Sequence, residues 1–311
     1  MVVCFISALI LPLCMVLLGC SDRDKPVKVD FAKKEEAAPV PAVNSVQPLR
    51  IAVGGMITPK EGFGYYRAFL DYLAEKLGRP VKFVDRQNYA EINKLLRTGE
   101  VDVAFVCGGP YVSGKREFGM ELLVAPVAYG KSVYYSYIIV HKDSPLERFE
   151  DLRGKSFGFS DPLSNTGKLV PTAMLARMGE TPESYFSKVV YTKTHDRSIS
   201  AVAERIIDGA AVDSLIWEYA NRRNPVFTSK TRVILKSPPY GIPPVVVRPG
   251  LSPELKSRIR GAFLNAHHDP KGEEILKEMM IDRFVPIEDS AYDSIRELEG
   301  WVAQQQGKKQ P

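Results

Sequence analysis

The stretch FGFSDPLSNTG, residues 157–167, holds the pattern from which the fold can be inferred. A short apolar run ends before a turn with Pro162, and small hydroxyl and amide residues then open a helical pattern that continues to Arg177. A strand, a turn and a helix in succession form the unit from which α/β proteins are built. We therefore predict a helix that begins at about Thr166, at the edge of a sheet where α/β proteins bind ligands.

The same unit recurs on both sides of this stretch, from Leu49 onward. Short apolar runs alternate with amphipathic helical patterns, which is typical of the α/β class. The predicted strands cover residues 49–53, 81–84, 101–106, 122–128, 134–140, 156–159, 189–192, 211–213, 231–235 and 245–247. The predicted helices cover residues 66–78, 89–97, 166–177 and 198–208, and the tail from Pro253 to the C-terminus is expected to be helical.

The two halves of the chain resemble each other weakly. LLRTGEVD, residues 95–102, and IIDGAAVD, residues 206–213, both have a helix end, a glycine stop and a short strand with an aspartate. Any α/β unit can end in this way, so the repeat alone does not establish a duplication. Two similar lobes nevertheless explain the whole pattern best.

The expected lobes are joined by two extended crossing strands at a hinge. The crossings are predicted near residues 134–141 and 241–247. Residues 49–137 plus 245–311 would form lobe one, and residues 138–244 would form lobe two. Ligands of open α/β sheets bind beyond the carboxyl ends of the strands, so the cleft between the lobes is the expected site.

The start of the helix near Thr166 is a candidate anion-binding site. The first four N–H groups of a helix lack partners within the helix, and its N-terminus carries about half a positive charge. Ser164 and Thr166 add hydroxyl donors beside these groups. Together they would form a cradle for an oxyanion without a lysine. The alternative is ordinary N-capping, for which Ser, Asn and Thr are common residues.

Two further strand ends in the same half add His195 and Asp213 to the candidate site. His195 follows the strand at 189–192, where its imidazole could donate one hydrogen bond to an anion or bind it as imidazolium. A carboxylate beside a bound anion costs about 4 kcal/mol at 4 Å with an effective dielectric near 20. Asp213 would therefore favour a protonated, phosphate-like ligand over sulfate. The alternatives are a structural His195 and an Asp213 that caps a helix starting near Leu215.

The N-terminus predicts export and a lipid anchor. Residues 1–19 contain no charged side chain and form an apolar run that ends in Leu-Leu-Gly before Cys20, as in a lipoprotein signal peptide. A transmembrane anchor is the alternative, because about 18 apolar residues can span a bilayer. Residues 20–48 would be the lipidated cysteine and a flexible tether. We expect a periplasmic or otherwise extracytoplasmic protein attached to the membrane through Cys20.

Charge and cysteine content narrow the function classes. The net charge is +5, and the basic residues are spread along the chain, so no nucleic-acid surface is expected. Of the four cysteines, only Cys107 lies in the predicted folded part, which leaves no intrachain disulfide there. No metal-binding spacing and no Walker-type glycine loop occur, so we expect neither a metal nor a cofactor. We also expect a monomer.

A hydrolase is a rival interpretation, since Ser164, His195 and Asp213 could be written as a catalytic triad. The nucleophile elbow Gly-x-Ser-x-Gly is absent, and Ser164 precedes a helix without that strained turn. We therefore expect a binding protein and not an enzyme.

Three segments resemble the phosphonate-binding-protein family, the solute-binding proteins of ABC importers for phosphonate, phosphite and phosphate. They are SDPLSNTGKLVP at 160–171, His195-Asp196, and YSYIIVHKDSP at 135–145. The resemblance extends from Leu49 to about Pro253. It implies the two-lobe type II periplasmic-binding fold and an interaction with ABC permease subunits. It also implies that the ligand is contacted by Ser164, Asn165, Thr166 and His195, with cleft tyrosines at Tyr89 and Tyr134.

The chain departs from the family pattern in places. The family usually has Ser-Thr-Ser where this chain has Ser164-Asn165-Thr166, which still provides donors. The proline-rich turn at 238–244 lacks the acid that often helps to select the ligand, so an aminoalkylphosphonate is not expected.

Cys107, at a strand end in lobe one, allows a further alternative. Related arsenite-binding sensor proteins use a cleft cysteine, and this chain could likewise sense arsenite or a phosphorus oxyanion for a receptor kinase. A buried free cysteine is more often inert packing, because thiolate chemistry needs an exposed and activated site. The sequence does not separate transport from sensing.

Overall fold

A computed structural model describes residues 47–54, 59–86 and 88–307. The predicted signal peptide, Cys20 and the tether as far as residue 46 lie outside the described residues. Among the helices that the structure does describe, none combines the length and the apolar character needed to cross a bilayer.

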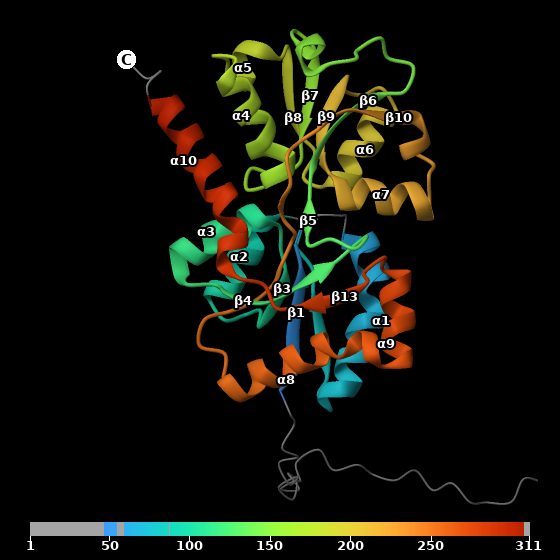
Figure 1. Cartoon of the computed structure of the whole chain (residues 1–311), viewed down its shortest axis with the longest axis vertical. Coiled ribbons are helices and arrows are strands. Elements are labelled where there is room, and N and C mark those ends of the chain that lie inside the picture. The colour runs from blue at the N-terminus through green and yellow to red at the C-terminus, as the bar shows by residue number, and fades with distance from the viewer. Residues whose placement is uncertain (1–46, 55–58, 87, 308–311) are drawn as a thin grey trace, which may run out of the picture. The chain divides into compact units, whose positions relative to one another are not determined.

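Two separate β-sheets organise the chain, as the two-lobe type II fold requires (Figure 1). The first sheet has the strand order β13–β4–β12–β3–β1–β2 and the second has the order β10–β6–β9–β7–β8. The strands of the first are β1 (Leu49–Val53), β2 (Val81–Val84), β3 (Val103–Phe105), β4 (Glu121–Val127), β12 (Val245–Val247) and β13 (Arg283–Val285). Those of the second are β6 (Ser136–His141), β7 (Ser156–Phe159), β8 (Lys188–Tyr191), β9 (Gly209–Asp213) and β10 (Thr231–Lys236).

Two short strands run between the lobes. β5 (Val133–Tyr134) pairs antiparallel with β11 (Tyr240–Gly241) and lies between the two larger sheets in Figure 1. The first predicted crossing therefore consists of β5 and β6, and the second of β11 and β12. The predicted lobe boundaries at residues 138 and 245 stay a prediction.

Helices cover the sheets of both lobes (Figure 1). Beside the first sheet lie α1 (Pro59–Leu77), α2 (Tyr89–Arg97), α3 (Gly108–Phe118), α8 (Pro253–Leu264) and α9 (Pro270–Glu278). Beside the second lie α4 (Val170–Arg177), α5 (Pro182–Tyr185), α6 (His195–Ala203) and α7 (Ser214–Arg223). α10 (Asp293–Gly307) begins near α3 and extends toward α4. The shorter helices are η1 (Phe149–Leu152), η2 (Asn165–Leu169), η3 (Thr228–Lys230), η4 (Ala266–His268) and η5 (Asp289–Tyr292).

The helix predicted at 66–78 is confirmed in α1, and its packing shows why it forms. The apolar stripe predicted from helical spacing is buried in the core of lobe one, and consists of Tyr66, Phe69, Leu70, Leu73 and Leu77. Full burial of such a side chain is worth about 1.5–3 kcal/mol. Gly78 follows with a φ of +56°, a left-handed conformation in which glycine commonly ends a helix.

Several predicted elements were wrong or missing. The segment from Gly108, to which no helix was assigned, forms α3, because its apolar residues pack inward despite two adjacent glycines. The expectation of a helical tail missed β13, which pairs antiparallel with β4. The helix predicted at 198–208 begins earlier, at His195. His195 is therefore the first residue of α6, with Thr194 as its N-cap, and it does not extend from a strand end.

Parallel pairing brings the candidate site residues to one edge of the second sheet. β7 runs parallel to both β8 and β9, so their carboxyl ends lie at the same edge. After β7, β8 and β9 the chain continues to Ser160, Thr194 and Ser214, respectively. In the first sheet β1 runs parallel to β2 and β3, and the end of β3 leads to Cys107.

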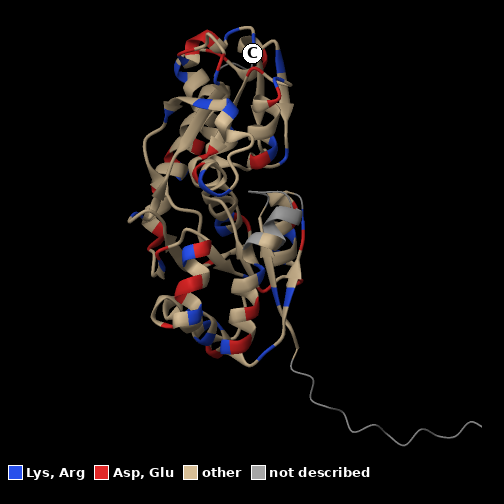
Figure 2. Ribbon diagram, turned by 90° about the vertical axis from the view of Figure 1, so that its right-hand side faces the viewer, with Lys and Arg blue, Asp and Glu red and all other residues tan. Residues whose placement is uncertain are grey.

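Charged residues of both signs are interspersed along both lobes (Figure 2).

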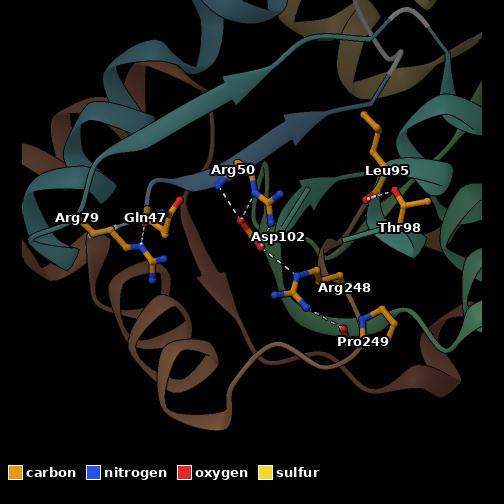
Figure 3. Close-up of polar contacts among 8 residues, drawn as sticks. All are labelled: Gln47, Arg50, Arg79, Leu95, Thr98, Asp102, Arg248 and Pro249. Atoms are coloured by element: carbon orange, nitrogen blue, oxygen red, sulfur yellow. Dashed lines mark hydrogen bonds and ion pairs between the residues drawn. The ribbon is translucent and has the colours of Figure 1, made fainter. Parts of the chain in front are cut away.

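An ion triad holds the opposite ends of three strands in lobe one (Figure 3). Both Nε and a terminal nitrogen of Arg50 donate to Asp102, at 2.9 and 2.8 Å, and Nε of Arg248 donates to the same carboxylate at 3.0 Å. Burial opposes ionisation of Asp102, but the bonds from the two arginines outweigh it and hold the pKa below its ordinary value. The triad thus joins β1, the start of β3 and the end of β12.

We expect Asp102→Asn to lower the free energy of unfolding by about 1.5–3 kcal/mol, the range for hydrogen bonds to charged groups. The amide cannot accept all of the arginine bonds, and it leaves two cations without a carboxylate. Urea denaturation measures the change. Asp71→Asn is the control, because Asp71 and Arg67 are 3.9 Å apart and largely exposed, and their loss should cost less than about 0.5 kcal/mol. Equal stability of the two variants would contradict the role of the triad.

Candidate functional site

The predicted cradle is a single π-helical turn, η2, placed directly before α4. Ser164 is its N-cap, and the Ser164 hydroxyl accepts from the N–H of Gly167 at 3.0 Å. The capping alternative is therefore realised for Ser164. The N–H of Val170 reaches back to the carbonyl of Asn165, which gives the wider π turn. Such turns are often found at functional sites.

Thr166 differs from Ser164, because its hydroxyl is not used for capping. The side chain is fully buried, and its Oγ1 has no hydrogen-bond partner among the described residues. The Ser136 hydroxyl donates to the Thr166 carbonyl at 2.6 Å and thereby fixes the backbone from β6. Since a buried hydroxyl without a partner costs free energy, this geometry indicates a group that accepts a hydrogen bond from Thr166.

Gly167 allows two other polar groups to approach the turn. A Cβ atom at this position would lie 1.9 Å from Oγ of Ser160 and 2.9 Å from Cε1 of His195. Only glycine fits these approaches. Ser160 is fully buried, and its Oγ has no partner within the part of the chain that the structure describes. It was not predicted as a site residue, although it directly follows β7.

The imidazole of His195 is fixed in one protonation state. Nδ1 accepts a hydrogen bond from the backbone N–H of Asp213 at 3.0 Å, so the ring proton must reside on Nε2. Nε2 lies 3.5 Å from Oγ of Ser164. Burial lowers the pKa of His195 to about 3. His195 is therefore a neutral donor, and the imidazolium considered from the sequence is excluded at neutral pH.

This tautomer also argues against the hydrolase alternative. A catalytic histidine takes a proton on Nε2 and donates from Nδ1 to a carboxylate. In this protein Nε2 already carries the proton, and Nδ1 faces a backbone N–H and no carboxylate. The set Ser164, His195 and Asp213 thus cannot act as a general-base triad.

Asp213 both caps a helix and presents a carboxylate oxygen to the site. It ends β9 and is the N-cap of α7, where Oδ1 accepts from the N–H of Leu215 at 2.8 Å. Oδ2 is buried and finds no partner from any residue that the structure describes. Burial raises the pKa of this carboxyl to about 7, although the N–H groups of Leu215 and Ile216 oppose the shift. A proton is therefore available at Asp213 near neutral pH.

Lobe one supplies the opposite wall. Tyr134 lies at the centre of a hydrogen-bonded group, since its hydroxyl is 3.1 Å from Sγ of Cys107 and accepts from Nδ2 of Asn165 at 3.1 Å. The two ends of an amide side chain have the same shape. The reverse orientation would place Oδ1 against the tyrosine hydroxyl and the amide donor toward the site. Tyr89, the first residue of α2, is fully buried, and its hydroxyl lacks a partner within residues 47–54, 59–86 and 88–307.

Cys107 is buried at the N-cap of α3 and faces this group. Burial, together with the nearby Asp213 carboxylate, raises the pKa of its thiol, while the hydrogen bond from Tyr134 opposes the shift. The residue is consequently a thiol and not a thiolate at neutral pH.

The structure thus brings together all eight side chains that were predicted for the site, and it adds two. The predicted set is Ser164, Asn165, Thr166, His195, Asp213, Tyr89, Tyr134 and Cys107, and every member is buried. The additions are Ser160 and Thr194, whose buried hydroxyls also lack partners in the described ranges. Thr194 could have been noticed as the N-cap position next to His195. No cluster of metal-ligating side chains occurs among the described residues.

Two cavities border the buried set. A groove of about 710 Å³ is lined by residues of both lobes, including Asn88 and Arg86 from one and Ser160 and Lys193 from the other. A small pocket of about 60 Å³ is lined by Asp213. Its walls are mainly aromatic and apolar and include Tyr66, Phe105 and Ile216. Of the buried set, Ser160 lines the groove and Asp213 lines the small pocket.

Two proteins of known function are similar to this chain in sequence. The chain is 29% identical to the phosphonates-binding periplasmic protein of Escherichia coli over 235 residues, which cover 74% of this chain and 69% of the relative. It is 25% identical to the phosphate-import protein PhnD of Mycolicibacterium smegmatis, with 92% of each chain covered. These relatives are substrate-binding proteins and not enzymes.

A solved structure shows the same architecture. The binding-protein component of an ABC phosphonate transporter from Pseudomonas aeruginosa superposes with a TM-score of 0.79 at 25% identity, covering 84% of this chain and 88% of the other. The family model described as "ABC transporter, phosphonate, periplasmic substrate-binding protein" matches residues 56–292, well over half of the chain. The chain therefore belongs to the family of periplasmic substrate-binding proteins of phosphonate ABC transporters.

Proposed function

We propose that this chain is a lipid-anchored extracytoplasmic protein that captures a phosphate-, phosphite- or phosphonate-like oxyanion for an ABC transporter. The observation that carries the proposal is the group of buried hydroxyls without partners at the edge of the second sheet, on Ser160, Thr166 and Thr194. Ser160 and His195 both approach Gly167 in η2, and the Nε2 proton of His195 adds a further neutral donor beside them. Such an arrangement suits a ligand that accepts hydrogen bonds on several sides.

The ligand class follows from the balance of charge. The site set contains a carboxylic acid, Asp213, and neither lysine nor arginine. An ionised Asp213 would repel an anion by about 4 kcal/mol at 4 Å with an effective dielectric near 20. One proton shared between Asp213 and the ligand removes this repulsion. Phosphate and phosphonate can carry such a proton near neutral pH, whereas sulfate cannot.

The relatives support transport rather than sensing or catalysis. Those described above are named for binding phosphonates and for importing phosphate.

We expect Thr166→Val to weaken binding of the preferred oxyanion by about 1.5–3 kcal/mol, because it removes a hydrogen bond to a charged group. His195→Ala should have an effect of similar size. Calorimetry with phosphate, phosphite, methylphosphonate, sulfate and arsenite would identify the ligand, for which we expect micromolar or tighter affinity, about −8 kcal/mol.

The matched control is Thr231→Val. Thr231 is also buried, but its hydroxyl donates to the Thr228 carbonyl and accepts from Nε1 of Trp217, each at 3.0 Å, and it pairs with His141 at the opposite edge of the second sheet. This variant should bind as the wild type does. Undiminished affinity in Thr166→Val would refute the cradle.

We expect the affinity to fall as the pH rises above about 7. Burial raises the pKa of Asp213 to about 7, and a bound anion raises it further, so binding above that pH takes up a proton. Relative to Asp213→Asn, the wild type should lose affinity by about tenfold per pH unit in this range. Because both proteins are measured with the same ligand, a change in the protonation of the ligand affects both affinities equally and cancels in their ratio. Parallel pH profiles would show that Asp213 does not share the proton.

We expect the full-length protein to take up a labelled fatty acid in cells and Cys20→Ala to take up none, because the variant has no thiol to receive the lipid. Labelling with radioactive palmitate, followed by immunoprecipitation and gel electrophoresis, measures the difference. Absence of label from the full-length protein would refute the lipid anchor.

A further inference from the structure

A carboxylate from lobe two contacts a helix of lobe one close to the site. The backbone N–H of Tyr89, at the start of α2, donates to Oδ2 of Asp161 at 3.3 Å. Oδ1 of the same side chain accepts from the N–H of Leu163 at 2.8 Å, within the turn that precedes η2. Asp161 is only 2% exposed. One carboxylate therefore joins the turn of lobe two to the helix of lobe one.

The electrostatics of α2 explain why an acid suits this position. The N-cap of α2, Asn88, accepts from the N–H of Glu91 at 2.8 Å, which leaves other N–H groups of the first turn without helical partners. The partial positive charge of a helix N-terminus favours a carboxylate by about 0.3–1 kcal/mol, and by up to about 2 kcal/mol where the pair is partly buried. Burial raises the pKa of Asp161, and the N–H groups of Leu163 and Tyr89 oppose this rise.

The lobes are in close contact at the same turn. A Cβ atom on Gly109, in α3 of lobe one, would lie 2.1 Å from the carbonyl oxygen of Leu163 and 3.1 Å from the N atom of Asn165. Asn165 in turn donates to the hydroxyl of Tyr134 at 3.1 Å. The turn that holds the proposed anion cradle is therefore one of the parts of lobe two that pack against lobe one.

We propose that Asp161 is a positioning residue that couples lobe closure to ligand binding. Its contact with Tyr89 forms only when the lobes are together, while its contact with Leu163 belongs to lobe two alone. A ligand bound by η2 then has a higher affinity because the Asp161–Tyr89 contact stabilises the closed form, although the ligand contacts neither group of that hydrogen bond. The inference rests on the proposed function, because affinity for the oxyanion is one of its measures.

Two substitutions separate the contacts of Asp161. Asp161→Asn keeps one acceptor oxygen, which can serve Leu163 or Tyr89 but not both, and places an NH₂ group opposite the other N–H. Asp161→Ser keeps a short oxygen acceptor for Leu163 but is too short to reach Tyr89. Asp151→Asn is the matched control, because Asp151 accepts from the N–H groups of Glu147 and Arg148 within lobe two.

Calorimetry of the full-length protein with methylphosphonate and with phosphate provides the first measure. Both Asp161 variants should bind about five- to thirtyfold more weakly than the wild type, which corresponds to the loss of one helix-end contact. Hydrogen exchange of the peptide that spans the start of α2, with and without ligand, provides the second. The Tyr89 amide should exchange about tenfold faster in both variants, because a lost hydrogen bond exposes it. Asp151→Asn should match the wild type in both measures.

Distinct outcomes test the inference and the proposed function separately. Wild-type affinity with unchanged exchange in Asp161→Asn would overturn the role of Asp161. So would normal affinity in Asp161→Ser, since the bond to Leu163 alone would then suffice. If the wild type bound neither anion, the proposed function would fail, and the exchange measured without ligand would still decide whether Asp161 protects the Tyr89 amide.

Discussion

The hydrogen bond from the Asp213 N–H to Nδ1 of His195 determines the chemistry of the site. It places the imidazole proton on Nε2 and leaves the ring neutral, so the histidine can only donate toward Ser164 and its surroundings. The bond joins the end of β9 to the start of α6 in the second sheet. Because the backbone sets the tautomer, the donor does not depend on a side chain that could rotate away.

Neutral donors have a physical advantage in a transport protein. Lysine or arginine in a buried site would hold an anion strongly, and the desolvation of such a cation would itself cost several kcal/mol. Hydroxyl and imidazole donors lose less on desolvation and distinguish ligands by geometry. In the proposed site, the carboxyl of Asp213 would add a further criterion, since its proton would have to be shared with the ligand or lost. Binding would then be selective for protonated anions without being excessively tight.

The strand ends were predictable from the sequence because they follow from local patterns. The short apolar runs before Ser160 and His195 and up to Asp213 correctly predicted that these residues lie at one edge of the second sheet, and the turn at 160–167 leads into the helical turn η2 as expected. Contacts between distant segments could not be predicted in the same way. α3 begins with two glycines, and β13 is held by its pairing with β4, so neither has a strong local signal. The tautomer of His195 likewise depends on a bond across 18 residues.

The burial of Cys107 has a consequence for an exported protein. It is the free cysteine of the described residues, its side chain is inaccessible to solvent, and its thiol resists ionisation. Oxidation to sulfenic acid and exchange with disulfides both require an accessible thiolate. The folded part can thus reside in an oxidising compartment without damage at this sulfur or mispairing with a neighbouring molecule.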